Sequence, residues 1–360
     1  MTFLTRSDFL LSRNAFSVYI LLLFLITFIL SKFPGHNGDM PFYIACVIEK
    51  ESGSMDGVVA QTKEVLQKEL PASEYQVHAA RLGDADPVIL ERYRIKPLYI
   101  LLVLVFHKLG FSYVHATVIP SLIGYLLIGL SIWRFTIQRL DPVRTFLIST
   151  ACMIIYPALA LARLSTPDAM SCFFMLNALL LIYFGRNKTV WICLFLLAIC
   201  TRIDNVVSEL IFLFALWKWP VFNFSEKLTG KEFVGFSMTL ISVALLVNLM
   251  SARHFFWFMD PYFSQPVGQY VNDIRIYFLV MAGSFFMSLF ILFLISGFGR
   301  GFSGKLEVNY LFYVVSALVF VRFLLYPYYE DRYLLSFYLF SLLIFSFHAG
   351  DLKKSITGTS

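Results

Sequence analysis

Residues 97–111, PLYILLVLVFHKLGF, decide how the chain is threaded through a membrane. The stretch is apolar but short, whereas a spanning helix needs roughly 17–25 apolar residues. Whether it crosses fixes the side of the membrane on which every later segment emerges. The charges of the remaining loops therefore provide the test.

The composition is that of an integral membrane protein. Of the 360 residues, 59% are hydrophobic and only 14% are charged, against about 25% charged residues in soluble domains. The apolar runs suffice for about ten spans, so we expect an all-α transmembrane fold with residues 1–360 as a single domain. The spans are expected at about 15–31, 113–133, 144–162, 166–184, 189–201, 203–219, 232–250, 275–297, 306–325 and 332–349. A first non-cytoplasmic loop over 32–112 would carry interfacial or re-entrant helices, and 251–274 would form a second outer loop.

The basic residues favour a topology in which 97–111 does not cross. With the N-terminus inside, the cytoplasmic segments hold fourteen of the 29 Lys and Arg residues. If 97–111 crossed, twelve of these would face outward, against the enrichment of Lys and Arg in short cytoplasmic loops. We therefore predict a multi-pass protein of the plasma membrane, or of the inner membrane in a bacterium, with both termini cytoplasmic. The fourteen residues are Arg6, Arg13, Arg134, Arg139, Arg144, Arg186, Lys188, Lys218, Lys227, Lys231, Arg300, Lys305, Lys353 and Lys354.

Several other classes are disfavoured. The net charge of +6 is explained by these loops, and no basic run with interleaved aromatics indicates nucleic-acid binding. The five cysteines form neither a disulfide framework nor a CxxC metal site. No phosphate-binding glycine loop or dinucleotide fingerprint is present, so we expect no cytosolic nucleotide donor and no cofactor. The six histidines are scattered and form no cluster with the cysteines, so we expect no metal site. Residues 15–30 lack an Ala-x-Ala-type cleavage site and resemble an uncleaved first span more than a signal peptide.

Two segments have a predicted local structure that bears on function. Residues 56–70 place apolar side chains on a helical stripe with charges between, which predicts an interfacial helix stopped by Pro71. The short apolar runs 189–201 and 203–219 meet at a charged tip that contains Arg202 and Asp204. Such a pair predicts a helical hairpin that ends below the membrane surface and lines a wet cavity.

Ionisable residues gather on the non-cytoplasmic side of this topology. Charged groups at membrane depth are costly and usually functional. Each also has a structural explanation: Asp39 and Asp168 as helix caps, Lys96 as a snorkelling lysine, and Arg202 with Asp204 as a local pair. Glu330 to Arg332 would form an outer turn. The predicted site contains Asp39, Tyr43, Arg94, Lys96, Asp168, Arg202, Asp204, Glu330, Asp331, Arg332 and Tyr333.

In their order along the chain, these motifs resemble those of the GT-C superfamily of polytopic glycosyltransferases. The similar branch uses polyprenyl-phosphate sugars and includes protein O-mannosyltransferases and lipid A aminoarabinose transferases. The chain departs from that pattern in having one proline after Lys96 rather than two, and Ile203 where proline is common. The matching stretches are Gly38-Asp39-Met40-Pro41-Phe42-Tyr43, Lys96-Pro97-Leu98-Tyr99, Leu164-Ser165-Thr166-Pro167-Asp168, Thr201-Arg202-Ile203-Asp204 and Glu330-Asp331-Arg332-Tyr333-Leu334.

The resemblance implies transfer of a sugar from a polyprenyl-phosphate donor to a glycan, lipid or protein acceptor on the non-cytoplasmic face. Asp39 would be the general base for the acceptor hydroxyl. Lys96, Arg202 and Arg332 would stabilise the leaving phosphate. The alternatives are an outward-facing polysaccharide polymerase or ligase, a lipid or solute transporter, and a scaffold subunit.

Overall fold

The computed structural model describes residues 6–83, 87–218, 228–251, 268, 271–276, 334–344 and 346–347. In these ranges the regular secondary structure is helical, and a single bridge between Gly35 and Leu164 is isolated, so the all-α prediction is confirmed for this part of the protein. The helices are α1 (Arg6–Ser31), α2 (Met40–Ser52), α3 (Val58–Glu69), α4 (Ala72–Leu82), α5 (Pro87–Arg94), α6 (Pro97–Lys108), α7 (Tyr113–Thr136), α8 (Pro142–Ile154), α9 (Tyr156–Arg163), α10 (Asp168–Tyr183), α11 (Lys188–Thr201), α12 (Asn205–Lys218) and α13 (Gly230–Ser251).

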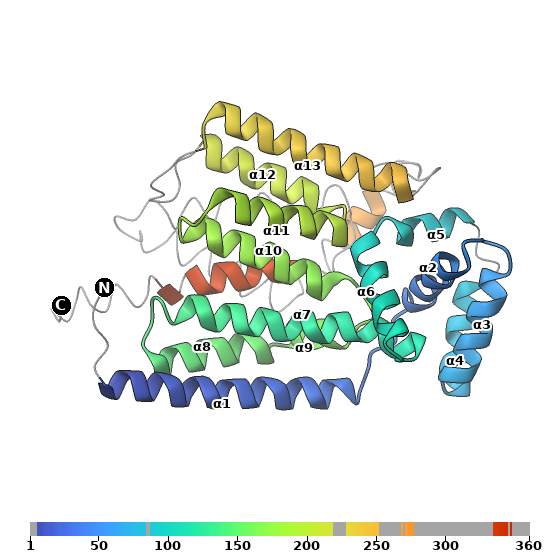
Figure 1. Cartoon of the computed structure of the whole chain (residues 1–360), viewed down its shortest axis with the longest axis horizontal. Helices are drawn as coiled ribbons and strands as arrows, with labels where there is room; N and C mark the ends of the chain where they lie inside the picture. Colours follow the sequence, from blue (N-terminus) through green and yellow to red (C-terminus); the bar gives the residue numbers. More distant parts are fainter. Residues whose placement is uncertain are drawn as a thin grey trace.

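These helices fall into two regions (Figure 1). Helix α1 and helices α7 to α13 run side by side along the long axis of the molecule, and together we call them the bundle. Helices α2 to α6 gather at one end of the bundle, and we call them the end assembly. The candidate site lies where the two regions meet, because α1 leads into α2 there and α10 begins there.

Within the described ranges, three helices are long and apolar enough to cross a membrane: residues 12–31 of α1, α7 and α13. Helices α8 and α9 form a fourth candidate if they are counted as one span broken by a bend of 58°. The described residues therefore support a membrane protein with several apolar helices. The ten predicted spans are not all covered, because most of the segment expected over 275–297 and all of the segment expected over 306–325 lie outside the described residues, as does most of the loop expected over 251–274.

The break between α8 and α9 differs from the single span predicted over 144–162. Ile155 has an extended backbone, and Pro157 stands in the first turn of α9. Proline has no backbone N–H to continue the hydrogen-bond ladder, and its ring clashes with the preceding turn. The helix therefore stops and restarts at this point.

Helix α6 covers most of the stretch 97–111. Its 12 residues make it about 18 Å long at 1.5 Å per residue, which is short of the hydrocarbon core of about 30 Å. The chain turns at Gly110, which has a positive φ of 98°. Helix α7 then starts at the end of the bundle where α6 lies (Figure 1). The chain does not traverse the bundle in this stretch, while the predicted topology itself stays a prediction.

Small residues let the bundle helices approach closely. A Cβ atom added to Gly124 of α7 would lie 2.8 Å from the backbone carbon of Ala169 in α10. At Gly129 it would meet Leu23 of α1, and the Tyr19 hydroxyl donates to the Gly129 carbonyl oxygen at 2.9 Å. Close backbone contact of this kind drives helix association in membranes.

The helices of the end assembly pack around small apolar cores and are also joined by ion pairs and hydrogen bonds. Arg94 of α5 pairs with Glu49 of α2 at 2.7 Å, and His36 pairs with Glu74 of α4 at 2.6 Å. The carboxylate of Glu69, at the end of α3, accepts from the backbone N–H groups of Tyr113 and Val114 at the start of α7. Helix α3, predicted over 56–70, is confirmed, and it ends at Glu69 just before Pro71.

Candidate functional site

The loop after α1 is fastened to the segment that precedes α10. The backbone N–H of Gly35 donates to the carbonyl oxygen of Arg163 at 2.8 Å, and Gly35 forms a parallel bridge with Leu164. The Arg163 guanidinium in turn donates to the Phe33 carbonyl oxygen. These contacts bring Asp39, which follows the loop, toward Asp168 at the start of α10.

Asp39 begins α2, but its carboxylate does not cap the helix. Backbone N–H groups of Phe42 and Tyr43 donate to the Asp39 carbonyl oxygen, while its side chain makes no capping hydrogen bond. Instead, Oδ1 accepts from the Tyr93 hydroxyl at 3.0 Å and Oδ2 accepts from the Asn37 amide at 3.3 Å. Two hydrogen-bond donors thus orient the carboxylate, and the side chain of Asp39 does not act as a helix cap.

The glycine before Asp39 makes room for a side chain from α4. A Cβ atom at Gly38 would lie 1.4 Å from Nη1 of Arg81. The backbone of Gly38 does not have a positive φ, so the glycine is not needed for a turn. The Gly-Asp pair of the sequence motif therefore reflects the approach of the Arg81 guanidinium to the loop that carries Asp39.

Tyr93, which holds Asp39, was not predicted as a site residue. Its ring stacks on Phe42 with centroids 4.6 Å apart. Burial raises the pKa of Tyr93, and the neighbouring Asp39 carboxylate raises it further, so the phenol stays protonated and donates. Tyr93 lies three residues before Lys96 at the end of α5, but between Arg92 and Arg94 nothing in the sequence marks it as functional.

Lys96 lies among tyrosines at the start of α6. Its Nζ donates to the Tyr43 hydroxyl at 2.9 Å and lies 5.1 and 4.9 Å from the ring centroids of Tyr43 and Tyr93. Burial lowers the pKa of the Lys96 ammonium, and the Asp39 carboxylate opposes this shift. The side chain therefore does not snorkel away to the surface. Over the described ranges it makes no ion pair, and two of its three N–H donors remain for a ligand.

Arg202 lies between two carboxylates. Helix α11 ends at Thr201, and Arg202 is extended, with φ −149° and ψ 107°. Its guanidinium pairs with Asp168 and forms a two-pronged contact with Asp204, through Nε at 3.1 Å and Nη2 at 2.9 Å. Asp168 is only 4% exposed. The predicted local pair of Arg202 and Asp204 is confirmed, and Asp168 serves as a second partner rather than as a cap.

The neighbouring Asn205 fixes the hairpin of α11 and α12 against α10. Its side-chain amide donates to the Ser171 hydroxyl at 2.8 Å and to the Ala198 carbonyl oxygen at 2.9 Å. The hairpin of two 14-residue helices is present as the sequence predicted. Each helix is about 21 Å long, which is shorter than the hydrocarbon core of about 30 Å.

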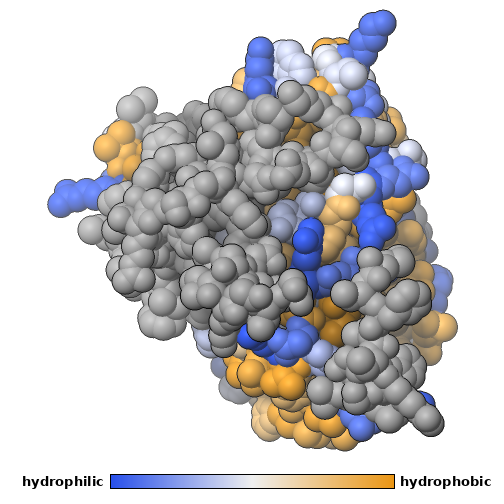
Figure 2. Space-filling view, turned by 90° about the vertical axis from the view of Figure 1, so that its left-hand side faces the viewer, coloured by the Kyte–Doolittle hydropathy of each residue, from blue (hydrophilic) through white to orange (hydrophobic). Residues whose placement is uncertain are grey.

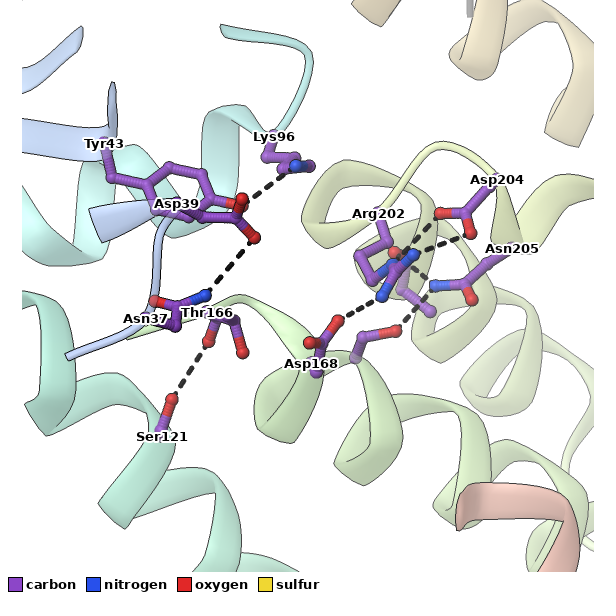
Figure 3. A network of polar contacts seen from close by, with 12 residues as sticks. Asn37, Asp39, Tyr43, Lys96, Ser121, Thr166, Asp168, Arg202, Asp204 and Asn205 are labelled. Carbon is purple, nitrogen blue, oxygen red and sulfur yellow. Dashed lines mark hydrogen bonds and ion pairs between the residues drawn. The ribbon is translucent and has the colours of Figure 1, made fainter. Parts of the chain in front are cut away.

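Two polar groups face each other in this part of the molecule (Figure 3). One holds Asp39, Tyr43 and Lys96, and the other holds Asp168, Arg202, Asp204 and Asn205. The charges of Arg202, Asp168 and Asp204 all act on Lys96. Because Arg202 already has two carboxylate partners, Lys96 is the better placed of these two cations to bind an added anion.

Four predicted residues cannot be compared with this arrangement, and one lies apart from it. Arg94 is engaged by Glu49 and Met55 between α5 and α2 rather than by the Asp39 group. In the described part of the chain, no group of three or more His, Cys, Asp or Glu side chains is arranged to hold a metal ion. The residues outside the described ranges are Glu330, Asp331, Arg332 and Tyr333.

Comparison with protein-family models, with characterised proteins and with solved structures gives no match. The function is therefore inferred from the chemistry of the two facing groups and from the motifs that contain them.

Proposed function

We propose that this protein is a membrane glycosyltransferase that moves a sugar from a polyprenyl-phosphate donor to an acceptor hydroxyl. The observation that supports this most is the juxtaposition of Asp39, a carboxylate oriented by two donors, with Lys96, a partly buried cation that has donors to spare. A base beside a phosphate-binding cation is what displacement of a sugar from a phosphate requires. The order of sequence motifs around these residues supports the same class.

In the proposed reaction the acceptor oxygen attacks the anomeric carbon of the sugar. The bond between that carbon and the phosphate oxygen breaks, and polyprenyl phosphate leaves with the bonding electrons. Asp39 takes the proton of the acceptor hydroxyl. Each of its carboxylate oxygens accepts one hydrogen bond within the protein, so a lone pair remains on each for the acceptor.

Lys96 would bind the leaving phosphate, and Arg332 of the Glu-Asp-Arg-Tyr motif would add a second cation. Arg202 would contribute mainly by positioning, because Asp168 and Asp204 already neutralise its charge. The partly desolvated surroundings of Lys96 strengthen its attraction for a phosphate relative to that of a lysine in water.

The distribution of charge supports a site on the non-cytoplasmic side. At the end of the bundle away from the end assembly, the helix connections carry basic residues, and Figure 2 shows hydrophilic residues on that face. Such residues mark the cytoplasmic side. The basic residues of these connections and helix ends are Arg134, Arg139, Arg144, Arg186, Lys188, Lys218 and Lys231.

The test is transfer of label from polyprenyl-phosphate sugars by the purified protein in detergent. We expect Asp39→Asn to lower turnover by about 10²–10⁴-fold, the usual contribution of a general base, while membrane insertion stays intact. Asp141→Asn is the matched control, because Asp141 caps α8 at the opposite end of the bundle. Turnover near the wild-type level in Asp39→Asn would exclude Asp39 as the base.

One observation favours a transporter as the second candidate. Glu209 of α12 is 0% exposed, and neither of its carboxylate oxygens has a hydrogen-bond partner among the described residues. A lone carboxylate inside a membrane helix is typical of a site that carries a proton or an ion. Uptake of solute by proteoliposomes that is lost in Glu209→Gln, together with no sugar transfer by the wild type, would favour this alternative.

A polysaccharide polymerase or ligase would use a similar donor and the same catalytic groups. The two enzyme functions differ in the acceptor. Transfer of label to a growing glycan, rather than of one sugar to each acceptor, would identify the polymerase.

A further inference from the structure

Two uncharged side chains, Asn37 and Thr166, lie between the two polar groups. Each residue lies two positions beyond the isolated bridge that joins Gly35 to Leu164. In the view of Figure 3, Thr166 is drawn near Asn37, between the Asp39 and Asp168 sides of the network. We call Asn37 and Thr166 the polar floor.

Each side chain of the polar floor has a buried oxygen without a partner. Thr166 is 2% exposed, and its Oγ1 makes no hydrogen bond within the described chain. Its carbonyl oxygen is used, because it accepts from the Ser121 hydroxyl at 2.9 Å. The amide nitrogen of Asn37 donates to Asp39, whereas its Oδ1 is buried and unpaired among the described residues. Buried polar atoms normally have a protein, water or ligand partner.

We infer that the polar floor binds hydroxyl groups of the sugar carried by the donor, an inference that rests on the proposed function. A hydroxyl and an amide oxygen can accept from and donate to sugar hydroxyls. The carboxylates of Asp39 and Asp168 on either side would repel a phosphate, and a polyprenyl tail could not satisfy either oxygen. The phosphate is therefore assigned to Lys96 and the sugar to the polar floor.

This division of the site places the anomeric carbon between the polar floor and Lys96. Asn37 holds Asp39 with its amide nitrogen and would hold the sugar with its amide oxygen. The base and the sugar would then be aligned by one side chain. Thr166 would act as a specificity-determining residue, because its hydroxyl distinguishes sugars by the hydroxyl placed opposite it.

The experiment measures binding without turnover, by ligand-induced thermal stabilisation of the purified protein. The probes are a panel of polyprenyl-phosphate hexoses and pentoses, with polyprenyl phosphate as the sugar-free reference. Thr166→Val keeps the shape of the side chain and removes its hydroxyl. We expect affinity for the preferred sugar-bearing lipid to fall about threefold to tenfold, as for the loss of one neutral hydrogen bond, with no change for polyprenyl phosphate.

Two variants act as controls. Thr150→Val removes a hydroxyl that is also buried and unpaired among the described residues, but which lies in α8 within the bundle, so it should leave both affinities unchanged. Thr166→Ser retains the hydroxyl and should retain most of the affinity for the sugar-bearing lipid. If Thr166→Val does not fold, Asn37→Ala provides the same comparison at the other side chain of the polar floor.

The outcomes separate this inference from the proposed function. If no sugar-bearing lipid binds the wild type, the proposed donor is wrong and the inference fails with it. If one does, and Thr166→Val binds it equally well, only the polar floor is refuted. An equal loss of affinity for both lipids in Thr166→Val would show that the floor holds water or phosphate, which also overturns the inference.

Discussion

In the bundle, small residues let neighbouring helices approach closely, whereas in the end assembly short helices with small apolar cores are also joined by ion pairs and side-chain hydrogen bonds. Gly124 and Ala169 typify the first region, and Glu49 with Arg94 the second. Lipid tails are as apolar as the helices they surround, so close packing rather than the hydrophobic effect must hold the bundle together. The candidate site has Asp39, Tyr43 and Lys96 on the side of the end assembly, and Asp168, Arg202 and Asp204 on the side of the bundle.

The largest effect is expected from removing the guanidinium of Arg202, which lies on the bundle side of the site. Arg202→Met would leave the carboxylates of Asp168 and Asp204 without their shared cation. Loss of one partner from a buried ion pair costs about 3–5 kcal/mol, so we expect a marked fall in the midpoint of thermal unfolding in detergent.

The matched control restores the charge balance. Adding Asp168→Asn and Asp204→Asn to Arg202→Met should recover part of the lost stability, because residues in one network are not additive. If the three substitutions destabilise the protein additively, Arg202 does not neutralise these carboxylates in the folded protein. The distinction drawn between Arg202 and Lys96 would then fail.

A smaller effect should follow from adding one methyl group to the bundle interface. Gly124→Ala would place a Cβ atom 2.8 Å from the backbone of Ala169, which forces α7 and α10 apart at a cost of about 1–3 kcal/mol. Gly235→Ala in α13 is the control, since no atom lies within 4 Å of its added Cβ. Equal unfolding midpoints for the two variants would show that α7 and α10 do not meet at Gly124.

The smallest effect concerns Lys96, which lies in the end assembly but is partly desolvated. Because burial lowers its pKa, the ammonium is charged below this lowered value and loses its proton as the pH rises through it. We expect kcat/KM for the polyprenyl-phosphate sugar to decline at a lower alkaline pH than an ordinary lysine would give. At neutral pH, Lys96→Arg should change kcat/KM only a few-fold.

The arginine variant tests the cause of this decline. Arginine remains protonated across the accessible pH range, so Lys96→Arg should abolish the alkaline decline that the wild type shows. An unchanged alkaline limb in Lys96→Arg would mean that another group titrates there. Lys96 would then not be the phosphate ligand.

Much of the helix arrangement could be predicted from the sequence, because it depends on the lengths of the apolar runs and on the numbers of Lys and Arg residues in the loops. The shortness of 97–111 and the distribution of Lys and Arg predicted that this stretch does not cross the membrane, and α6 is indeed too short to run the length of the bundle. The same counting predicted Asp39, Lys96 and Asp168 on one side of the membrane, and they lie where the bundle and the end assembly meet. Such inferences require only helix lengths and charges, which are local properties of the chain.

The contacts between distant segments could not be predicted in this way. Tyr93 holds Asp39 across 54 positions of the chain, and Arg94, which was expected in the site, is turned to Glu49 by the packing of α5 on α2. The unpaired oxygens of Asn37 and Thr166 become visible only once the two segments lie together. The predicted roles of Arg332 and Tyr333 remain predictions, since these residues lie outside the described ranges.

The fastening of Gly35 to Leu164 also bears on how the protein is made. A chain synthesised only as far as Ala162 already holds Asp39 and Lys96, but Leu164, Asp168, Arg202 and Asp204 have not yet been made. The two facing groups can be assembled only after the hairpin of α11 and α12 has been synthesised. A chain whose translation stops before Leu164 would thus lack the residue that fastens the Asp39 loop, and the unfastened loop would distinguish it from the mature protein for a quality-control protease.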